Sequence, residues 1–437
     1  MYLHIAIILY FGSVCFLPLL LWPSRRNIRV FAGLPFAFIA YFLGADYFIE
    51  MARANNYPSE DVFDLYTVML LMSTILFVVF FCCGYFHQWR LKYRLNYLFD
   101  SFEVNYLDCI IRQSHWLACA SVIMFLIAFY GMGFIPAFAE NPLMAKYGAG
   151  EYHEQYQSFA IFYRMGLNLA SLAIVLLLLR WGYSKRSYTS IIFFVLVFGC
   201  LFLSLRRGMI GGAIFGVLFS YMALQSRLKF VSFFVLYSMV YCLGAAGNEI
   251  FFYAIGVRES IDLSSIFLGV PDVADQLLFL GSWIDGRWDY TYGLTWIGGL
   301  IPYNFDYNIG AYSLKVIGSQ AGEVASGGFR LPVPVIGYIS FDWLGVVTFV
   351  SSSAYLDGLI LSSMRHRLQD ATNKDFMILN VFLLPVFAGV FSSAITGFLM
   401  DQVFIIIVVY FLCLRAKRIC AHNTKTSVAR QSYLHGR

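Results

Sequence analysis

Charged side chains are scarce in this sequence. Only 13% of its 437 residues are Asp, Glu, Lys or Arg, whereas 60% are hydrophobic, and the mean hydropathy is +0.71. A soluble domain of this length could not bury so much apolar surface in one core. The composition therefore excludes a soluble protein and predicts a membrane protein that crosses the bilayer several times.

Several sequence motifs are also missing. No Walker A, HExxH or GxSxG pattern occurs, which argues against ATP-driven transport, metalloprotease and serine-hydrolase activities. The nine cysteines fall in apolar runs or on the side expected to be cytoplasmic, so no disulfide framework or metal site is expected in the outer loops. We expect no cofactor, and nothing in the charge pattern suggests nucleic-acid binding.

Long apolar runs dominate the chain instead. Runs of about 20 residues mark membrane-spanning helices. The first run lacks a basic n-region and an A-x-A-like cleavage site, so it is expected to be a retained helix and not a signal peptide. The predicted fold class is all-α and polytopic, with a single integral membrane domain over 1–437. About eleven spans are expected, near 3–22, 30–48, 65–87, 115–134, 158–179, 189–204, 208–224, 231–254, 337–361, 376–396 and 403–415.

The basic residues predict the orientation. Of the 30 Lys and Arg residues, 21 lie in alternate loops or in the C-terminal tail, where the positive-inside rule places the cytoplasm and anionic lipid. The N-terminus is then outside, the C-terminus is inside, and one large outer loop over 255–333 precedes the last three spans. Within that loop, 264–286 has apolar residues at helical spacing after Pro271, which predicts a short amphipathic helix lying on the membrane.

The remaining nine basic residues lie on the outer side, and most are Arg, whose planar fork suits bidentate binding of phosphate. Arg206 and Arg207 stand in "CLFLSLRRGMIGG", between two apolar runs with no room for a solvated loop. An arginine near the membrane centre costs about 2.5–3.5 kcal/mol, which favours a compensating anion. Two structural alternatives stay open: snorkelling to lipid headgroups, or pairing with a carboxylate such as Glu249 or Asp401. Arg164 is a second charge inside a predicted span.

The segment "GSWIDGRWDYTYGLTWIGGLIPYNFDY" (281–307) interleaves charged and aromatic residues. Aromatic faces can stack on sugar rings, while carboxylates and arginine bind hydroxyls or phosphate. An interfacial aromatic belt is the alternative interpretation. Arg330 is expected on the same side, with Asp342 just inside the following span. The candidate ligand residues here are Trp283, Asp285, Arg287, Trp288, Asp289, Tyr290 and Tyr292.

Outer arginines, aromatic rings and carboxylates together suit a lipid pyrophosphate that carries sugars. In glycosyl transfer from such a lipid, arginines would neutralise the charge that develops on the departing pyrophosphate. A carboxylate or a histidine would take the proton from the attacking hydroxyl. The candidates for this base are His153, Asp285, Asp289 and Glu249.

In these features the chain resembles the O-antigen polymerases, the Wzy-type family of bacterial oligosaccharide repeat-unit polymerases. The resemblance includes the layout of about eleven spans with one dominant outer loop before the last three. It also includes the arginine-glycine turn "SLRRGMIGG", the segment "GYISFDWLGVV" (337–347), and the R-x10-G spacing from Arg287 to Gly298.

The resemblance implies a GT-C-like fold and an inverting, metal-independent glycosyltransferase in lipopolysaccharide biosynthesis. The enzyme would move a growing glycan from undecaprenyl pyrophosphate to the non-reducing end of a new lipid-linked unit, at the periplasmic face of the inner membrane. A polysaccharide chain-length-determinant protein would be a partner. Asp285 and Glu249 are preferred to His153 as the base, and sugar binding falls to Trp283, Trp288, Tyr290, Tyr292 and Asp289. The pyrophosphate-binding residues would be Arg206, Arg207, Arg287 and Arg330.

Two other functions stay open. An O-antigen ligase shares the substrate and the architecture, but such ligases usually use a histidine in the large outer loop, and 255–333 contains none. A polysaccharide flippase or transporter would be expected to place charges along a central pathway, whereas the unusual charges here gather at one face.

Overall fold

The computed structural model describes residues 2–21, 49–50, 53, 57–87, 111–183, 188–205, 272–297, 307–318, 328–329 and 331–370, together with isolated positions between 235 and 253 and between 407 and 418. All regular elements in these ranges are helices, and no strand occurs among them. The predicted all-α class is therefore confirmed for this part of the chain.

Six long helices coincide with predicted spans. They are α1 (Tyr2–Leu21), α4 (Glu60–Phe86), α7 (Ser114–Met132), α9 (His153–Tyr183), α10 (Tyr188–Leu203) and α16 (Val333–Asp370). Shorter helices connect them: α8 (Pro142–Tyr147), α13 (Asp272–Asp285), α14 (Leu294–Ile297) and α15 (Ile309–Val316). The predicted spans 30–48, 208–224, 231–254 and 376–396, and most of 403–415, lie outside the described residues.

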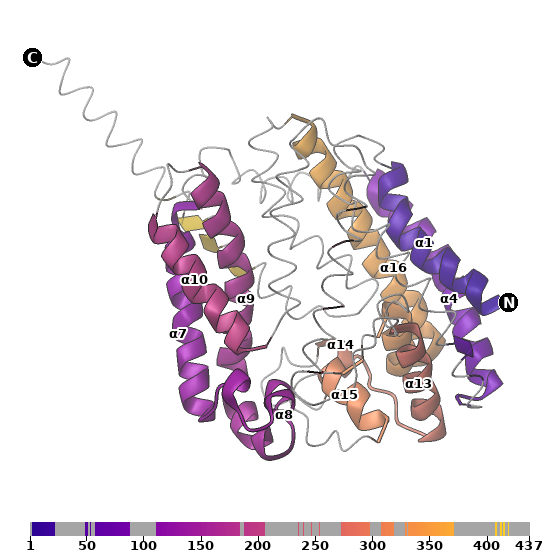
Figure 1. Ribbon diagram of the computed structural model, residues 1–437. Coiled ribbons are helices and arrows are strands. Elements are labelled where there is room, and N and C mark those ends of the chain that lie inside the picture. Colours follow the sequence, from indigo (N-terminus) through magenta and orange to yellow (C-terminus); the bar gives the residue numbers. More distant parts are fainter. Residues whose placement is uncertain are drawn as a thin grey trace, which may run out of the picture.

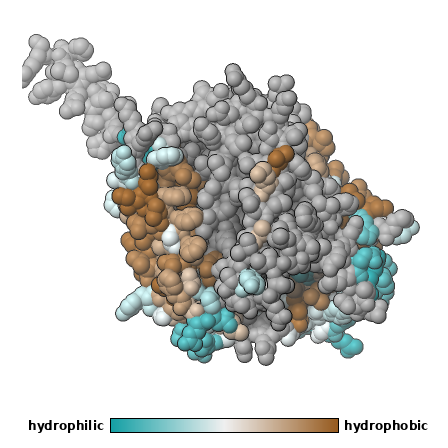
Figure 2. Space-filling view, viewed as in Figure 1, coloured by the Kyte–Doolittle hydropathy of each residue, from teal (hydrophilic) through white to brown (hydrophobic). Residues whose placement is uncertain are grey.

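Four of the described stretches are long and apolar enough to cross a membrane: Glu60–Phe86, Ser114–Met132, Met144–Leu178 and Val333–Ser362. Helices α1 and α10 are apolar but shorter. Large apolar side chains such as Ile123, Leu126 and Ile192 are exposed on the surface of these helices. Figure 2 shows a broad hydrophobic surface on the left of the molecule, over the group of α7, α9 and α10. Such faces are stable in lipid, and the chain is accordingly a helical, membrane-embedded protein.

The long helices pack in two groups, α1 with α4 and α16, and α7 with α9 and α10 (Figure 1). The backbones of α4 and α16 are in direct contact. A Cβ added to Gly358 would lie 2.2 Å from the Phe81 carbonyl oxygen, and one added to Gly84 would lie 2.1 Å from that of Tyr355. Small residues at such crossings let helix backbones approach in a membrane.

The end contacts of the helices agree with the predicted alternation of sides. Tyr85 donates to the Leu21 carbonyl (2.9 Å), which joins the predicted cytoplasmic ends of two spans. Arg180 donates to the Arg112 carbonyl (2.7 Å), which joins two residues predicted to be cytoplasmic. The short helices α8, α13, α14 and α15 all lie at the opposite end of the bundle (Figure 1). They come from the two loops predicted to be outer, 135–157 and 255–333. The number of eleven spans, the GT-C-like fold and the orientation stay predictions.

Two details differ from the expectation. The helix predicted after Pro271 exists as α13, but its apolar side chains Val273, Leu277 and Leu280 are buried in the protein. The helix packs on α4 and α15, and the buried Tyr66 hydroxyl of α4 donates to Gln276. The prediction that this helix lies on the membrane surface is therefore wrong. Apolar residues at helical spacing indicate that one face of a helix is buried, but that face can pack on protein as well as on lipid.

The second difference is a break inside α16. Phe341 (φ −147°, ψ 30°) and Asp342 (φ 55°, ψ −145°) are not helical. Residues eight apart in a continuous helix are separated by about 12 Å, yet a Cβ on Gly337 would lie 2.5 Å from the Gly345 carbonyl oxygen. The segment 333–340 is thus a short helix that folds back on the start of the long one. The expected single helix over 337–361 is wrong at this point.

Candidate functional site

The last turn of α13 positions the first of the predicted ligand residues. The Arg287 amide donates to the Ile284 carbonyl (3.0 Å), and the Trp288 amide donates to the Trp283 carbonyl (3.2 Å). These two bonds form a Schellman motif, in which the residue after the cap adopts the left-handed conformation and is usually glycine. Here that residue is Arg287, with φ 49°, although Gly286 precedes it. The strained left-handed position is therefore occupied by an arginine, although the residue before it is a glycine, which would adopt this conformation without strain.

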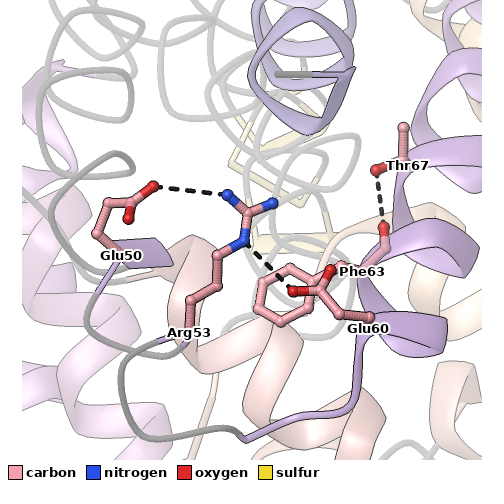
Figure 3. A network of polar contacts seen from close by, with 5 residues as sticks. All are labelled: Glu50, Arg53, Glu60, Phe63 and Thr67. Carbon is pink, nitrogen blue, oxygen red and sulfur yellow. Dashed lines mark hydrogen bonds and ion pairs between the residues drawn. The ribbon is translucent and has the colours of Figure 1, made fainter.

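The Arg287 side chain is exposed, and the described residues place no carboxylate within ion-pairing distance of it. Arg53, another of the outer basic residues, differs. Figure 3 shows its guanidinium between Glu50 (3.5 Å) and Glu60 (3.8 Å), and it also lies 5.2 Å from the ring centroid of Phe63. Arg53 thus has protein partners, which is the structural alternative for an outer arginine, whereas Arg287 is available to a ligand.

A cluster of aromatic rings connects the segment after α13 to α15 and α16. Trp283 is only 6% exposed, and its indole N–H donates to the Tyr312 hydroxyl (3.1 Å). Its ring also lies near Tyr290 (centroids 5.5 Å apart) and Tyr338 (6.1 Å). A buried ring with its polar atom already bonded supports its neighbours, so Trp283 holds Tyr290 and Tyr312 in place and offers no open face for stacking.

Trp288 lies on the other side of Tyr312, with ring centroids 6.3 Å apart. The ammonium of Lys315 lies 5.9 Å from the Trp288 ring centroid, a cation–π contact that places this outer lysine beside the cluster. Burial raises the pKa of the Tyr312 hydroxyl, and the charges of Tyr307 and Asp289 raise it further, against the lowering effect of the hydrogen bond from Trp283. Asp289 itself is exposed.

Residues 290–292 are fixed to the end of the short helix 333–340. The amides of Thr291 and Tyr292 donate to the carbonyls of Ile339 (2.8 Å) and Ser340 (3.2 Å). The Thr291 hydroxyl bonds those of Ser340 (3.2 Å) and Thr295 (3.0 Å). A helix end leaves carbonyls without intrahelical partners. The loop supplies the missing donors and so sets the position of its tyrosines relative to the corner of α16.

Asp342 stands at that corner, next to Tyr290. Its Oδ1 atom is buried and accepts no hydrogen bond. Its backbone (φ 55°, ψ −145°) is close to a region that essentially only glycine visits, at a cost of order 1–3 kcal/mol. Burial raises the pKa of the Tyr290 hydroxyl, and the Asp342 carboxylate raises it further through its charge and through a hydrogen bond with that hydroxyl. Asp342 therefore combines a strained backbone with one enclosed oxygen that has no donor among the described residues.

Two aromatic rings beside Asp342 are open to the outside. Tyr292 is 70% exposed and Phe341 is 40% exposed, with ring centroids 6.2 Å apart at an interplanar angle of 70°. Tyr292 also has a positive φ of 48° and is followed by Gly293 at φ 81°. The two rings form an aromatic surface at the same corner of the chain as the carboxylate.

The structure brings together only part of the predicted site. Trp283, Trp288, Tyr290 and Tyr292 belong to one cluster, and Asp285, Arg287 and Asp289 lie on the exposed segment that joins it to α13. Trp283 was predicted to bind sugar, but it is buried and has no open face for stacking. The roles of the other residues with a ligand stay predictions. The other predicted site residues, Arg206, Arg207, Glu249 and Arg330, lie outside the described residues.

The described chain stops one residue before Arg206. Helix α10 ends at Leu203, and Leu205 adopts φ 57°, so the chain leaves the helix where the sequence predicts a tight turn. The buried hydroxyl of Tyr163 on α9 donates to the Ser204 carbonyl (3.0 Å) and fixes this end. The neighbouring Arg164 is half-buried. Arg164 thus follows, along α9, the residue that bonds the end of α10, whereas Arg206 and Arg207 lie outside the described residues.

His153, the histidine among the candidate bases, begins α9, and its Nδ1 atom is buried without a hydrogen-bond partner. Within the described ranges, no group of three or more His, Cys, Asp or Glu residues could hold a metal ion. No protein-family model, no curated protein and no solved structure matches this chain. The site therefore has to be interpreted from its own residues.

Sequence reasoning placed Asp342 just inside a span and did not choose it as a site residue. Neither Phe341 nor Asp342 is a helix breaker, so no local signal marks the corner. The only hint is the pair Gly337 and Gly345, whose backbones meet when the chain folds back.

Proposed function

We propose that this chain is an oligosaccharide repeat-unit polymerase of the bacterial inner membrane. It would transfer a growing glycan from undecaprenyl pyrophosphate to the non-reducing end of a new lipid-linked unit at the periplasmic face. A chain-length-determinant protein would be its partner. The observation that carries the proposal is found at one end of the bundle, where an exposed, strained Arg287 follows α13 and an aromatic cluster contacts a half-buried carboxylate, Asp342.

The chemistry of these groups supports glycosyl transfer. A guanidinium that has no carboxylate partner among the described residues can bind the pyrophosphate and stabilise the negative charge that grows as it leaves. Aromatic rings at the same corner can contact the C–H faces of sugars. The half-buried carboxylate of Asp342 supplies a base of the kind that the acceptor hydroxyl needs. Direct inversion at the anomeric carbon requires no metal ion when these groups are in place.

Deletion of the gene tests the proposal against its alternatives. A polymerase mutant retains lipopolysaccharide that carries a single repeat unit and loses the long ladder on a gel. Loss of all repeat units would instead support the ligase or the flippase. An unchanged ladder would contradict every one of these functions. Arg287→Ala on a plasmid should fail to restore the ladder at a protein level equal to that of the wild type.

A further inference from the structure

We propose that Asp342 is the catalytic base of this site and that it binds the acceptor hydroxyl at the corner of α16, beside the rings of Tyr292 and Phe341. This inference rests on the proposed function. It replaces Asp285 and Glu249, the two carboxylates that the sequence favours, by one that the fold singles out.

The ordinary structural role of an aspartate at this position does not apply to Asp342. It immediately precedes the long helical segment of α16, where an aspartate would normally accept a backbone N–H of the first turn. That cap requires extended backbone before the helix, whereas Asp342 has φ 55° and ψ −145°. Among the described residues, no group donates a hydrogen bond to its enclosed Oδ1 atom, although Tyr290 is hydrogen-bonded to the carboxylate. Helix capping therefore does not explain the aspartate at this position.

Contacts on two sides fix the position of the carboxylate. Thr291 and Tyr292 are bonded to the end of the short helix, and the packing of Gly337 on Gly345 fixes the other side of the corner. Tyr290 faces the carboxylate from the loop. Asp342 is half-buried, so a hydroxyl can approach it over the exposed rings of Tyr292 and Phe341. An aromatic belt at the membrane interface would explain those rings, but it would not explain a carboxylate on strained backbone among them.

The other described carboxylates fit the role less well. Asp285 and Asp289 are exposed, so water satisfies them and competes for their charge. Asp357 is buried and its two oxygens have no hydrogen-bond partner, but it lies 15 residues further along α16. That separation is about 22 Å of helix. Asp357 is near the end where Tyr355 bonds His87, opposite to the outer loops.

The step balances as follows. The acceptor hydroxyl oxygen forms a bond to the anomeric carbon of the growing glycan, while the bond from that carbon to the pyrophosphate oxygen breaks. The hydroxyl proton moves to the Asp342 carboxylate, and undecaprenyl pyrophosphate leaves with the electron pair, stabilised by arginine. Asp342 then returns the proton to water.

Asp342→Asn is the main test, because it has nearly the same shape and cannot accept the proton. Full-length protein in liposomes would receive lipid-linked single repeat units extracted from the deletion strain, and polymer would be measured by mass spectrometry. We expect kcat to fall by about 10²–10⁴-fold, with a much smaller change in KM. Asp64→Asn, an exposed carboxylate on α4, should retain wild-type activity.

Asp342→Gly separates catalysis from folding. Glycine tolerates this backbone without strain, so the variant should unfold at a denaturant concentration equal to or above that of the wild type while producing no polymer. Formate, a small carboxylate, should restore part of its activity and should not affect Asp342→Asn.

The outcomes distinguish the two proposals. Wild-type protein that makes no polymer from these lipids would refute the polymerase. Wild-type activity that persists in Asp342→Asn would refute only the base. Loss of activity accompanied by a lower unfolding midpoint in Asp342→Gly, without formate rescue, would assign Asp342 a structural role and would likewise refute the base.

Discussion

Replacing Arg287 by glycine should separate the function of this residue from its place in the fold. Arg287 occupies the left-handed position of the Schellman motif that ends α13. A non-glycine residue there costs about 1–2 kcal/mol. Glycine removes this cost, but it also gives the unfolded chain more conformational freedom, which offsets about 0.4–1 kcal/mol of the stabilisation. Arg287→Gly should therefore stabilise the protein by about 0.5–1 kcal/mol, roughly two- to fivefold in the folding equilibrium constant.

The same substitution removes the guanidinium, so polymerisation should be lost although stability rises. Stability would be measured by denaturant unfolding of the purified protein in detergent, and function by the ladder in the deletion strain. Arg287→Ala retains the positive φ and should lose function without becoming more stable. Arg287→Lys should recover little function, because an ammonium cannot form the planar bidentate contact.

A destabilised Arg287→Gly protein would refute this reasoning, because it would show that the arginine side chain supports the fold through contacts of its own. A normal ladder in Arg287→Gly would refute the role of Arg287 in binding pyrophosphate. The two measurements are independent, so each part of the argument can fail alone.

Two further predictions concern the helices. Gly358→Ala should destabilise the protein by about 1–3 kcal/mol, because its new Cβ would overlap the Phe81 carbonyl of α4. The matched control is Gly199→Ala on α10, where a Cβ meets nothing within 4 Å. This control should not lower the unfolding midpoint. The orientation predicts that Lys315→Cys reacts with a membrane-impermeant maleimide in cells with a permeabilised outer membrane, above the wild-type background. Arg112→Cys should react only after the inner membrane is opened, and the reverse pattern would contradict the N-out topology.

The spans were the most predictable feature of this protein. Lipid provides no hydrogen-bond partners, so each crossing segment has to be a helix with an apolar surface, and that requirement is visible as an apolar run. The described helices α4, α7 and α9 accordingly overlap the predicted runs. The end of α10 just before Arg206 was predictable for the same reason, because two arginines interrupt the apolar run.

The candidate site was predictable in part. The spacing of Trp283, Trp288 and Tyr290 marked an unusual outer segment, and these rings do gather in one cluster. Which ring would be buried was not visible, because Trp283 loses its open face only through packing against Tyr312 and Tyr338, residues from distant segments.

The amino-acid sequence by itself determined where helices cross the membrane and which loops concentrate charge and aromatic rings, because these are local consequences of hydropathy and spacing. The tertiary structure alone decided that α16 folds back at Asp342, since no local residue breaks the helix there. The break depends on the contact of Gly337 with Gly345 and on the amides of Thr291 and Tyr292, which satisfy the exposed carbonyls from about 50 residues away. Contacts at that separation exist only in the folded chain, and they position the carboxylate of Asp342.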